Sequence, residues 1–92
     1  MKKLKRPSDF EVDDFKGFRL EAVAHVPIIV IYNSPKDYPG KFVARLWDIG
    51  NKPTKFIVIK DDIEEIRKYV PAIMTRLGPS PGDDPVIVET YI

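Results

Sequence analysis

The sequence predicts an α+β fold, in which a mostly antiparallel sheet of four to five strands packs against one main helix in the order β-β-β-α-β. Three observations support this prediction. Short apolar runs bounded by turn residues recur along the chain, and the longest, 26–32, has the length of a strand. The segment 61–70 combines an acidic start with apolar residues at helical spacing. A length of 92 residues suits a single domain, 1–92, and a hydrophobic content of 43% excludes wholesale disorder.

The first eight residues, 1–8, form a basic N-terminal arm that we expect to be flexible. Acidic residues within 9–14 offset the arm, and the net charge of the whole chain is +1. A secretory signal would need an apolar stretch after the basic residues, and none follows, so we expect a cytoplasmic protein. The alternative use of the arm is a salt-sensitive attachment to a phosphate backbone.

Two apolar segments precede the first clear loop. Apolar residues occupy alternate positions from Phe18 to Val26, which favours a strand with one buried face. The same stretch also has helical propensity, and a helix with Phe15, Phe18 and Ala22 inward is the alternative. The continuous apolar run 28–32 predicts a strand that is covered on both sides.

The centre of the chain predicts a hairpin. The segment 33–40 is dense in turn-forming residues and predicts a loop before it. In the first strand, 41–48, one face receives Phe42, Ala44 and Leu46. The opposite face receives Lys41, Val43, Arg45 and Trp47. The turn 50–53 and a returning strand, 55–60, complete a hairpin with a loop of about six residues.

The main helix is predicted to begin at Asp62, which forms an Asp-x-x-Glu capping pattern with Glu65. Its apolar stripe consists of Ile63, Ile66 and Val70. A proline follows Val70, so the regular helix should end there, and 71–77 adds at most one further turn. The prolines and glycines of 78–85 predict an irregular segment, and 86–92 predicts the last strand.

Four runs of the sequence carry a family resemblance. They are Tyr-Pro-Gly-Lys-Phe-Val-Ala-Arg-Leu-Trp-Asp at 38–48, Pro-Thr at 53–54, Asp-Ile-Glu-Glu-Ile-Arg at 62–67 and Asp-Pro-Val-Ile-Val-Glu at 84–89. Together they resemble a family of small uncharacterised proteins from bacterial and phage or mobile-element genomes. The resemblance covers roughly residues 28–92 and implies an origin and a fold, but no catalytic residue. By association, it implies a small accessory or inhibitor protein that acts by docking, of the anti-CRISPR type.

The sequence lacks the residues on which most enzyme sites depend. It has no cysteine and a single histidine, His25, so thiolate zinc sites and cysteine nucleophiles are excluded and a Ser-His-Asp relay has no support. The five glycines match neither of the common phosphate-binding patterns. Acidic pairs such as Asp61-Asp62 lack the spacing of a calcium loop. We therefore expect a non-enzymatic protein without a catalytic, cofactor or metal site.

One short helix cannot cover both faces of the predicted sheet, so one face should remain open. On the last strand, the same alternation places Val86 and Val88 inside and Ile87, Glu89 and Tyr91 on the open face. Trp, Tyr and Arg are the residue types that dominate binding hot spots. The candidate partner-binding residues are therefore Arg45, Trp47, Tyr91, Lys41 and Tyr38, and the loop 33–40 is the next candidate.

Three alternatives remain for this open face. The segment 10–18 could fold over it, with Arg45 pairing to Glu89 across strands. It could instead bind a protein partner, including a second copy of the chain as a homodimer, or stack single-stranded nucleic acid. Asp37, Asp48 and Glu89 interrupt the basic groove that nucleic acid needs. A protein partner is therefore favoured, nucleic acid is the alternative, and no membrane contact is expected.

Overall fold

The computed structural model describes residues 9–16, 19–22, 24–50, 52–79 and 84–92. Its elements in chain order are β1 (Phe10–Glu11), the short 3-10 helix η1 (Leu20–Ala22), β2 (Ile28–Asn33), β3 (Phe42–Asp48), β4 (Lys52–Lys60), α1 (Ile63–Arg67), β5 (Arg76–Leu77) and β6 (Ile87–Tyr91). Within these ranges, no helix is long and apolar enough to cross a membrane.

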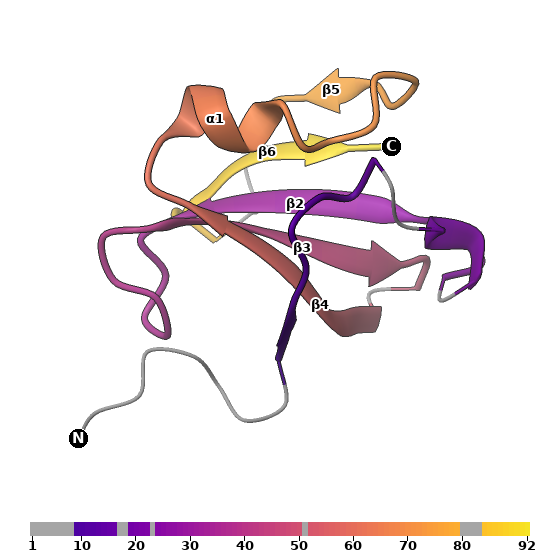
Figure 1. Ribbon diagram of the computed structural model, residues 1–92, viewed down its shortest axis with the longest axis horizontal. Coiled ribbons are helices and arrows are strands. Elements are labelled where there is room, and N and C mark those ends of the chain that lie inside the picture. The colour runs from indigo at the N-terminus through magenta and orange to yellow at the C-terminus, as the bar shows by residue number, and fades with distance from the viewer. Residues whose placement is uncertain (1–8, 17–18, 23, 51, 80–83) are drawn as a thin grey trace.

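Among the described residues, the strands form a six-stranded sheet in the order β1-β4-β3-β2-β6-β5. The pairing of β1 with β4 is parallel, and all other neighbours are antiparallel. Helix α1 packs on one face of this sheet, and it lies beside the edge strand β5 at the top of the view in Figure 1. The α+β class and the mostly antiparallel sheet are thus confirmed, whereas four to five strands was too few. The two additional edge strands, β1 and β5, have two residues each, which is too short for any periodic pattern.

The strand predicted from Phe18 to Val26 was wrong for the residues that the structure describes. Leu20–Ala22 forms a 3-10 helix, while residues 18 and 23 lie outside the described ranges. Leu20 and Ala24 are both buried, and the amide of Ala24 donates to the carbonyl of Leu20 at 2.9 Å. The helical alternative holds only in part, because Phe15 is buried as it predicted but Ala22 is exposed.

The hairpin of β3 and β4 has the predicted faces but a shorter connection. Strand β4 begins at Lys52, so only positions 49–51 separate the two strands, and Pro53 pairs with Trp47 inside the sheet. The register shifts between Arg45 and Trp47. There the Thr54 hydroxyl donates to the carbonyl of Leu46 at 2.7 Å and accepts from the amide of Phe56 at 3.2 Å, which satisfies the backbone at the irregularity.

The main core lies between the sheet and α1. Its fully buried members include Ile29, Ile31, Leu46, Val58 and Ile66. The prediction that Leu46 is a core residue is confirmed, and Phe42 and Ala44 pack on the same side. Phe15, Leu20 and Ala24 also belong to this core, so the N-terminal segment mainly covers the helix side of the sheet. That segment was expected, as one alternative, to cover the opposite face.

Helix α1 begins where the sequence predicted and ends earlier. Asp62 occupies the N-cap position with extended backbone angles, φ −136° and ψ 140°, but its side chain makes no capping hydrogen bond. The helix ends at Arg67 and turns follow it to Val70. The residues of the predicted apolar stripe, Ile63, Ile66 and Val70, all pack in the main core. After Pro71 the chain makes one turn, in which the amide of Met74 donates to the carbonyl of Pro71 at 3.1 Å, and β5 follows at Arg76.

The face assignment of the last strand was wrong for Glu89 and Tyr91. Ile31 pairs with Glu89 and Tyr32 pairs with Ile87, so β6 contains one extra residue, Val88, at a β-bulge. The bulge reverses the alternation after Val88, and Glu89 and Tyr91 therefore point to the helix side. Val88 packs on the main core, as expected.

Candidate binding face

The open face is the side of the sheet that faces away from α1, and it holds two adjoining hollows. The first, the loop hollow, has a volume of about 280 Å³ and is lined by Tyr32, Pro35, Asp37, Tyr38, Val43, Arg45, Trp47 and Pro53. The second, the strand hollow, has a volume of about 260 Å³ and is lined by Ile28, Val30, Tyr32, Trp47, Asp48, Ile87 and Thr90. The loop 33–40 thus contributes to the first hollow, and strands β2 and β6 form the second.

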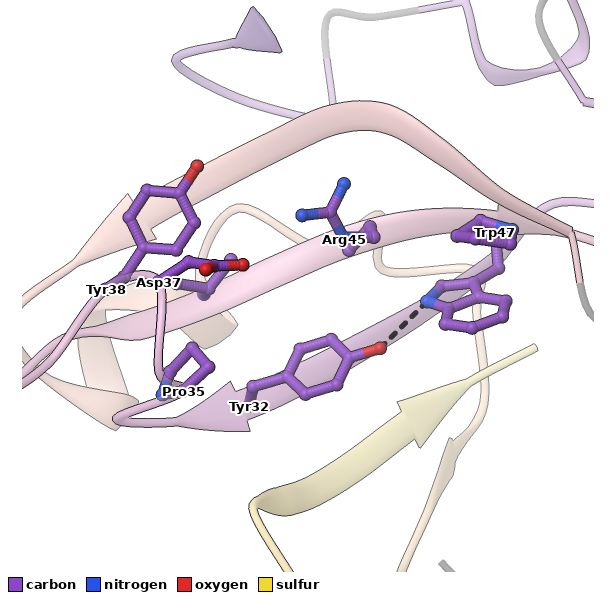
Figure 2. Close-up of a pocket in the computed structure, with 8 residues that line it drawn as sticks. Tyr32, Pro35, Asp37, Tyr38, Arg45 and Trp47 are labelled. Atoms are coloured by element: carbon purple, nitrogen blue, oxygen red, sulfur yellow. Dashed lines mark hydrogen bonds between the residues drawn. The ribbon is translucent and has the colours of Figure 1, made fainter. Parts of the chain in front are cut away.

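Tyr32 and Trp47 form the wall that the two hollows share. The indole Nε1–H of Trp47 donates to the hydroxyl oxygen of Tyr32 at 3.0 Å, as the dashed line in Figure 2 shows. Tyr32 comes from β2 and Trp47 from β3, and both side chains are partly buried. The hydrogen bond fixes two large aromatic side chains relative to each other, so the wall is ordered before any ligand binds.

Arg45 lies in the wall of the loop hollow, between Tyr38 and Trp47 in the view of Figure 2. Its Nη1 and Nη2 donate to the two carboxylate oxygens of Asp9 at 2.9 and 3.1 Å, and Nη1 also donates to the carbonyl of Thr54 at 2.8 Å. Arg45 is only 8% exposed and Asp9 is 7% exposed. The expected pair of Arg45 with Glu89 was therefore wrong. The guanidinium is neutralised within the fold and fastens the N-terminal segment to β3.

The structure separates the remaining predicted site residues. The Tyr38 hydroxyl donates to Asp9, and the Tyr38 ring packs in a second small core with Val43 and Ile57. Lys41 pairs with Asp61 and lines neither hollow. Tyr91 was predicted on the open face but lies on the opposite side, where it is 7% exposed and its hydroxyl donates to Glu89 at 2.9 Å. Of the five candidates, Tyr38, Arg45 and Trp47 thus meet at one hollow.

Asp48 closes one end of the strand hollow. Its carboxylate accepts the amide N–H groups of Val26 and Ile49 at 2.9 and 2.8 Å, and it lies 3.2 Å from Nδ1 of His25. The amide of Val26, followed by that of His25, holds the pKa of this carboxyl well below its usual range. Asp48 therefore brings a permanent negative charge to the open face near neutral pH.

A separate ionic cluster fastens α1 and β5 on the helix side. Glu89 accepts from Nε of Arg67 at 3.1 and 3.2 Å and lies 3.5 Å from Nη1 of Arg76. Burial opposes ionisation of Glu89, but hydrogen bonds from Arg67 and Tyr91 outweigh it, so that the pKa of Glu89 lies below its usual value. Burial, and then the hydrogen bond to Glu89, raises the pKa of Tyr91. In the ranges that the structure describes, no group of three or more His, Cys, Asp or Glu residues is arranged to hold a metal ion.

Sequence reasoning missed Asp9 and Tyr32. Asp9 is 36 positions from Arg45, and no local pattern indicates that pairing. Tyr32 could have been found, because alternation along 28–32 places it on the same face as Ile28 and Val30. Both alternating faces of 28–32 are apolar, so the sequence predicted a strand that is covered on both sides. In the structure, the face with Ile28, Val30 and Tyr32 lines the strand hollow.

Comparison with known protein families, curated proteins and solved structures found no match to this chain.

Proposed function

We propose that the chain is a non-enzymatic binding domain that docks a protein partner on the open face. The observation that carries this proposal is the pair of adjoining hollows with the shared Tyr32–Trp47 wall. Binding energy at protein interfaces concentrates where a few aromatic side chains sit beside pockets that exclude water. An aromatic wall that is already ordered also loses little conformational entropy on binding.

The charges of the open face favour a protein over a nucleic acid. Asp37, Arg45 and Asp48 are the charged residues in the walls of the two hollows. Arg45 is already paired with Asp9, and the other two are carboxylates. Single-stranded nucleic acid needs cations along its backbone beside the stacking aromatic residues. The nucleic-acid alternative therefore loses its main candidate cation.

An accessory or inhibitor role of the phage type would use the same face, and it stays a prediction. So does the homodimer, in which the partner would be a second copy of the chain. A cytoplasmic location likewise remains a prediction.

Affinity capture with a matched pair of variants tests the proposal. Thr90→Arg places a long charged side chain in the strand hollow. Ile73→Arg makes a comparable change at a residue that is 94% exposed and lines neither hollow. We expect Thr90→Arg to lose the captured partner and Ile73→Arg to retain it, with cooperative melting in both. Equal capture by the two variants would remove the open face as the docking site.

A further inference from the structure

We propose, resting on the proposed function, that the partner on the open face is a second copy of the chain. The two copies pack their open faces together around a twofold axis that runs along β6, in the plane between the two sheets. Leu77 of each copy then enters the strand hollow of the other copy. Three features of the open face support this arrangement: an apolar side chain that projects beside the hollow, the register of the strands, and the placement of charge.

A hollow and an exposed apolar side chain lie next to each other on this face. Leu77 in β5 pairs with Thr90 in β6, and residues directly opposite in neighbouring strands place their side chains on the same side of a sheet. Because Thr90 lines the strand hollow, Leu77 lies beside that hollow on the open face. Leu77 itself lines neither hollow and is 43% exposed. A contact between identical copies needs a feature and its complement on one surface, and the open face provides both.

The register places Leu77 and the base of the hollow on opposite sides of β6, each one strand away. Thr90 in β6 pairs with Val30 of β2 on one side and with Leu77 of β5 on the other. Val30 lines the strand hollow and is buried, so it lies at the base of the hollow. A twofold axis along β6 therefore brings Leu77 of each copy over Val30 of the other, and the two Thr90 residues face each other. The strands of the two sheets then run nearly aligned, which is a common packing of sheets.

The strand hollow suits a leucine side chain. Its volume is about 260 Å³, and its described walls are aliphatic and aromatic apart from Thr90 and Asp48. Val26 and Ile49 are exposed, and both of their amides donate to Asp48, so they extend the apolar surface at that end of the hollow. Entry of Leu77 withdraws apolar surface of both copies from water.

The placement of charge permits a contact between identical copies. A twofold axis brings each charge toward its own counterpart, so charge close to the axis would oppose the dimer. Glu89, the residue before Thr90, lies on the helix side with Arg76. Asp48, the charged residue among the described walls of the strand hollow, lies in β3 and already contacts His25 at 3.2 Å. Because β3 is two strands from β6, the two β3 strands are about four strand spacings apart, roughly 19 Å, which exceeds the screening length at physiological salt.

The size of the contact sets the affinity that we expect. The overlap of β2, β6 and β5 is about 14 Å wide and about 17 Å long, which is less than the roughly 800 Å² per partner of a standard interface. We therefore expect a weak, reversible dimer with a dissociation constant of about 0.1–1 mM. Sedimentation velocity of the intact protein between about 0.02 and 2 mM should show the mean mass rise from that of one chain toward that of two. A chain that stays monomeric at about 2 mM would overturn the inference.

Leu77→Arg and Ile73→Arg are a matched pair for this measurement. Both replace an exposed apolar residue with the same charged residue, but Ile73 lies in the turn before β5, whereas Leu77 pairs with Thr90 beside the strand hollow. We expect Leu77→Arg to weaken dimerisation by about tenfold or more and Ile73→Arg to leave it unchanged. Equal dimerisation of the two variants would place the contact elsewhere and overturn the inference.

Thr90 tests the position of the axis, because it faces its own counterpart. Thr90→Arg and Thr90→Glu should each remain monomeric, since two like charges then meet at the axis. An equimolar mixture of the two variants should dimerise again, because the mixed dimer pairs a guanidinium with a carboxylate there. A mixture of folded variants that stays monomeric would overturn the inference, and cooperative melting establishes that each variant is folded. If either variant fails to fold, the comparison of Leu77→Arg with Ile73→Arg decides.

Two further results separate this inference from the function on which it rests. If the chain stays monomeric and Thr90→Arg still abolishes capture of a different protein, the open face is a docking site for that protein and the dimer inference fails alone. If the chain stays monomeric and Thr90→Arg leaves capture intact, both fail.

Discussion

Each face of the sheet carries an arginine–carboxylate pair, and the two pairs differ in burial and in surroundings. On the helix side, Arg67 and Glu89 join α1 to β6. On the open face, Arg45 in β3 binds Asp9, the residue directly before β1. Both pairs fasten a part of the chain that is remote in sequence, so both stabilise the arrangement of segments around the central strands.

The surroundings of the two pairs differ. The side chain of Arg67 is 31% exposed, and Glu89 also receives Arg76 and Tyr91, so this pair is part of a network at the rim of a filled core. The side chains of Arg45 and Asp9 are 10% and 1% exposed, and they form the wall of a hollow. The wall of the loop hollow thus includes a buried ion pair, the Arg45–Asp9 clamp, whereas the Arg67–Glu89 pair lies beside the apolar core of the helix side. We therefore expect the stability of the fold to depend more on the Arg45–Asp9 pair than on the Arg67–Glu89 pair.

Replacement of Arg45 should produce the largest loss of stability. Arg45→Ala removes the two hydrogen bonds that the guanidinium donates to the buried Asp9 carboxylate and the one that it donates to the carbonyl of Thr54. We expect a loss of about 3–5 kcal/mol in the free energy of unfolding, measured by urea denaturation. Alternation alone placed Arg45 on the open face as a candidate partner-binding residue, and the structure adds that it stabilises the fold.

Arg67→Ala is the matched control on the helix side. Because the Arg67 side chain is more exposed and Arg76 stays near Glu89, we expect a smaller loss than for Arg45→Ala. Equal losses of stability in Arg45→Ala and Arg67→Ala would show that burial does not set the contribution of these two ion pairs.

Truncation of the core beneath the same strand should have the next largest effect. Leu46 is adjacent to Arg45 in β3, faces the helix side and is 0% exposed. Leu46→Ala should cost about 2–5 kcal/mol, because it removes buried methyl groups and leaves a cavity. Urea denaturation again provides the measurement. A loss below about 1 kcal/mol would mean that the core on this side is loosely packed.

The sequence was sufficient to predict most of the fold where alternation is regular. The opposite faces of Leu46 and Trp47 follow from the period of β3 alone. The alternation fails at β6, because the bulge at Val88 adds a residue that local sequence does not reveal. The edge strands β1 and β5 depend on pairing with distant segments, so their two-residue sequences contain no signal of their own.

The candidate site was predicted only in part, for a related reason. Trp47 and Arg45 were found because their strand has a clear period. Asp9 binds the Arg45 guanidinium within the fold, so that Arg45 is a structural residue. No regular pattern in the sequence around Asp9 indicates this pairing. Tyr91 was assigned to the wrong face by the same bulge that misplaced Glu89. Long-range pairing and bulges are properties of the folded sheet, and a single sequence gives little access to either.

The Arg67–Glu89 pair on the helix side should make the free energy of unfolding depend on pH in the acid range. The pKa of Glu89 lies below its ordinary value of 4.5 in the folded state, so Glu89 stabilises the fold above that value and the contribution is lost as the pH falls through the folded pKa. Glu89→Gln should cost about 1–3 kcal/mol at neutral pH, since it weakens hydrogen bonds to charged Arg67. Below about pH 4.5, its stability should decline less steeply than that of the wild type.

Glu64→Gln is the control for this measurement. Glu64 also pairs with Arg67, at 3.0 Å, but its side chain is 73% exposed. We expect its pH profile to follow that of the wild type closely. If Glu64→Gln and Glu89→Gln gave the same profile, burial would not be what makes Glu89 sensitive to acid.

The smallest loss of stability is expected at Asp62, which lies between β4 and the first residue of α1. The capping pattern predicts a loss of about 1 kcal/mol for Asp62→Ala. In the structure, Asp62 occupies the N-cap position without a side-chain hydrogen bond, which leaves only its charge near the helix N-terminus. We therefore expect a loss of about 0.3–0.5 kcal/mol, and an equal loss for Asp62→Asn, which removes the charge and keeps a capping oxygen. Denaturation midpoints of the two variants decide between these accounts: a loss near 1 kcal/mol for alanine that asparagine restores would show that the side chain caps the helix in solution.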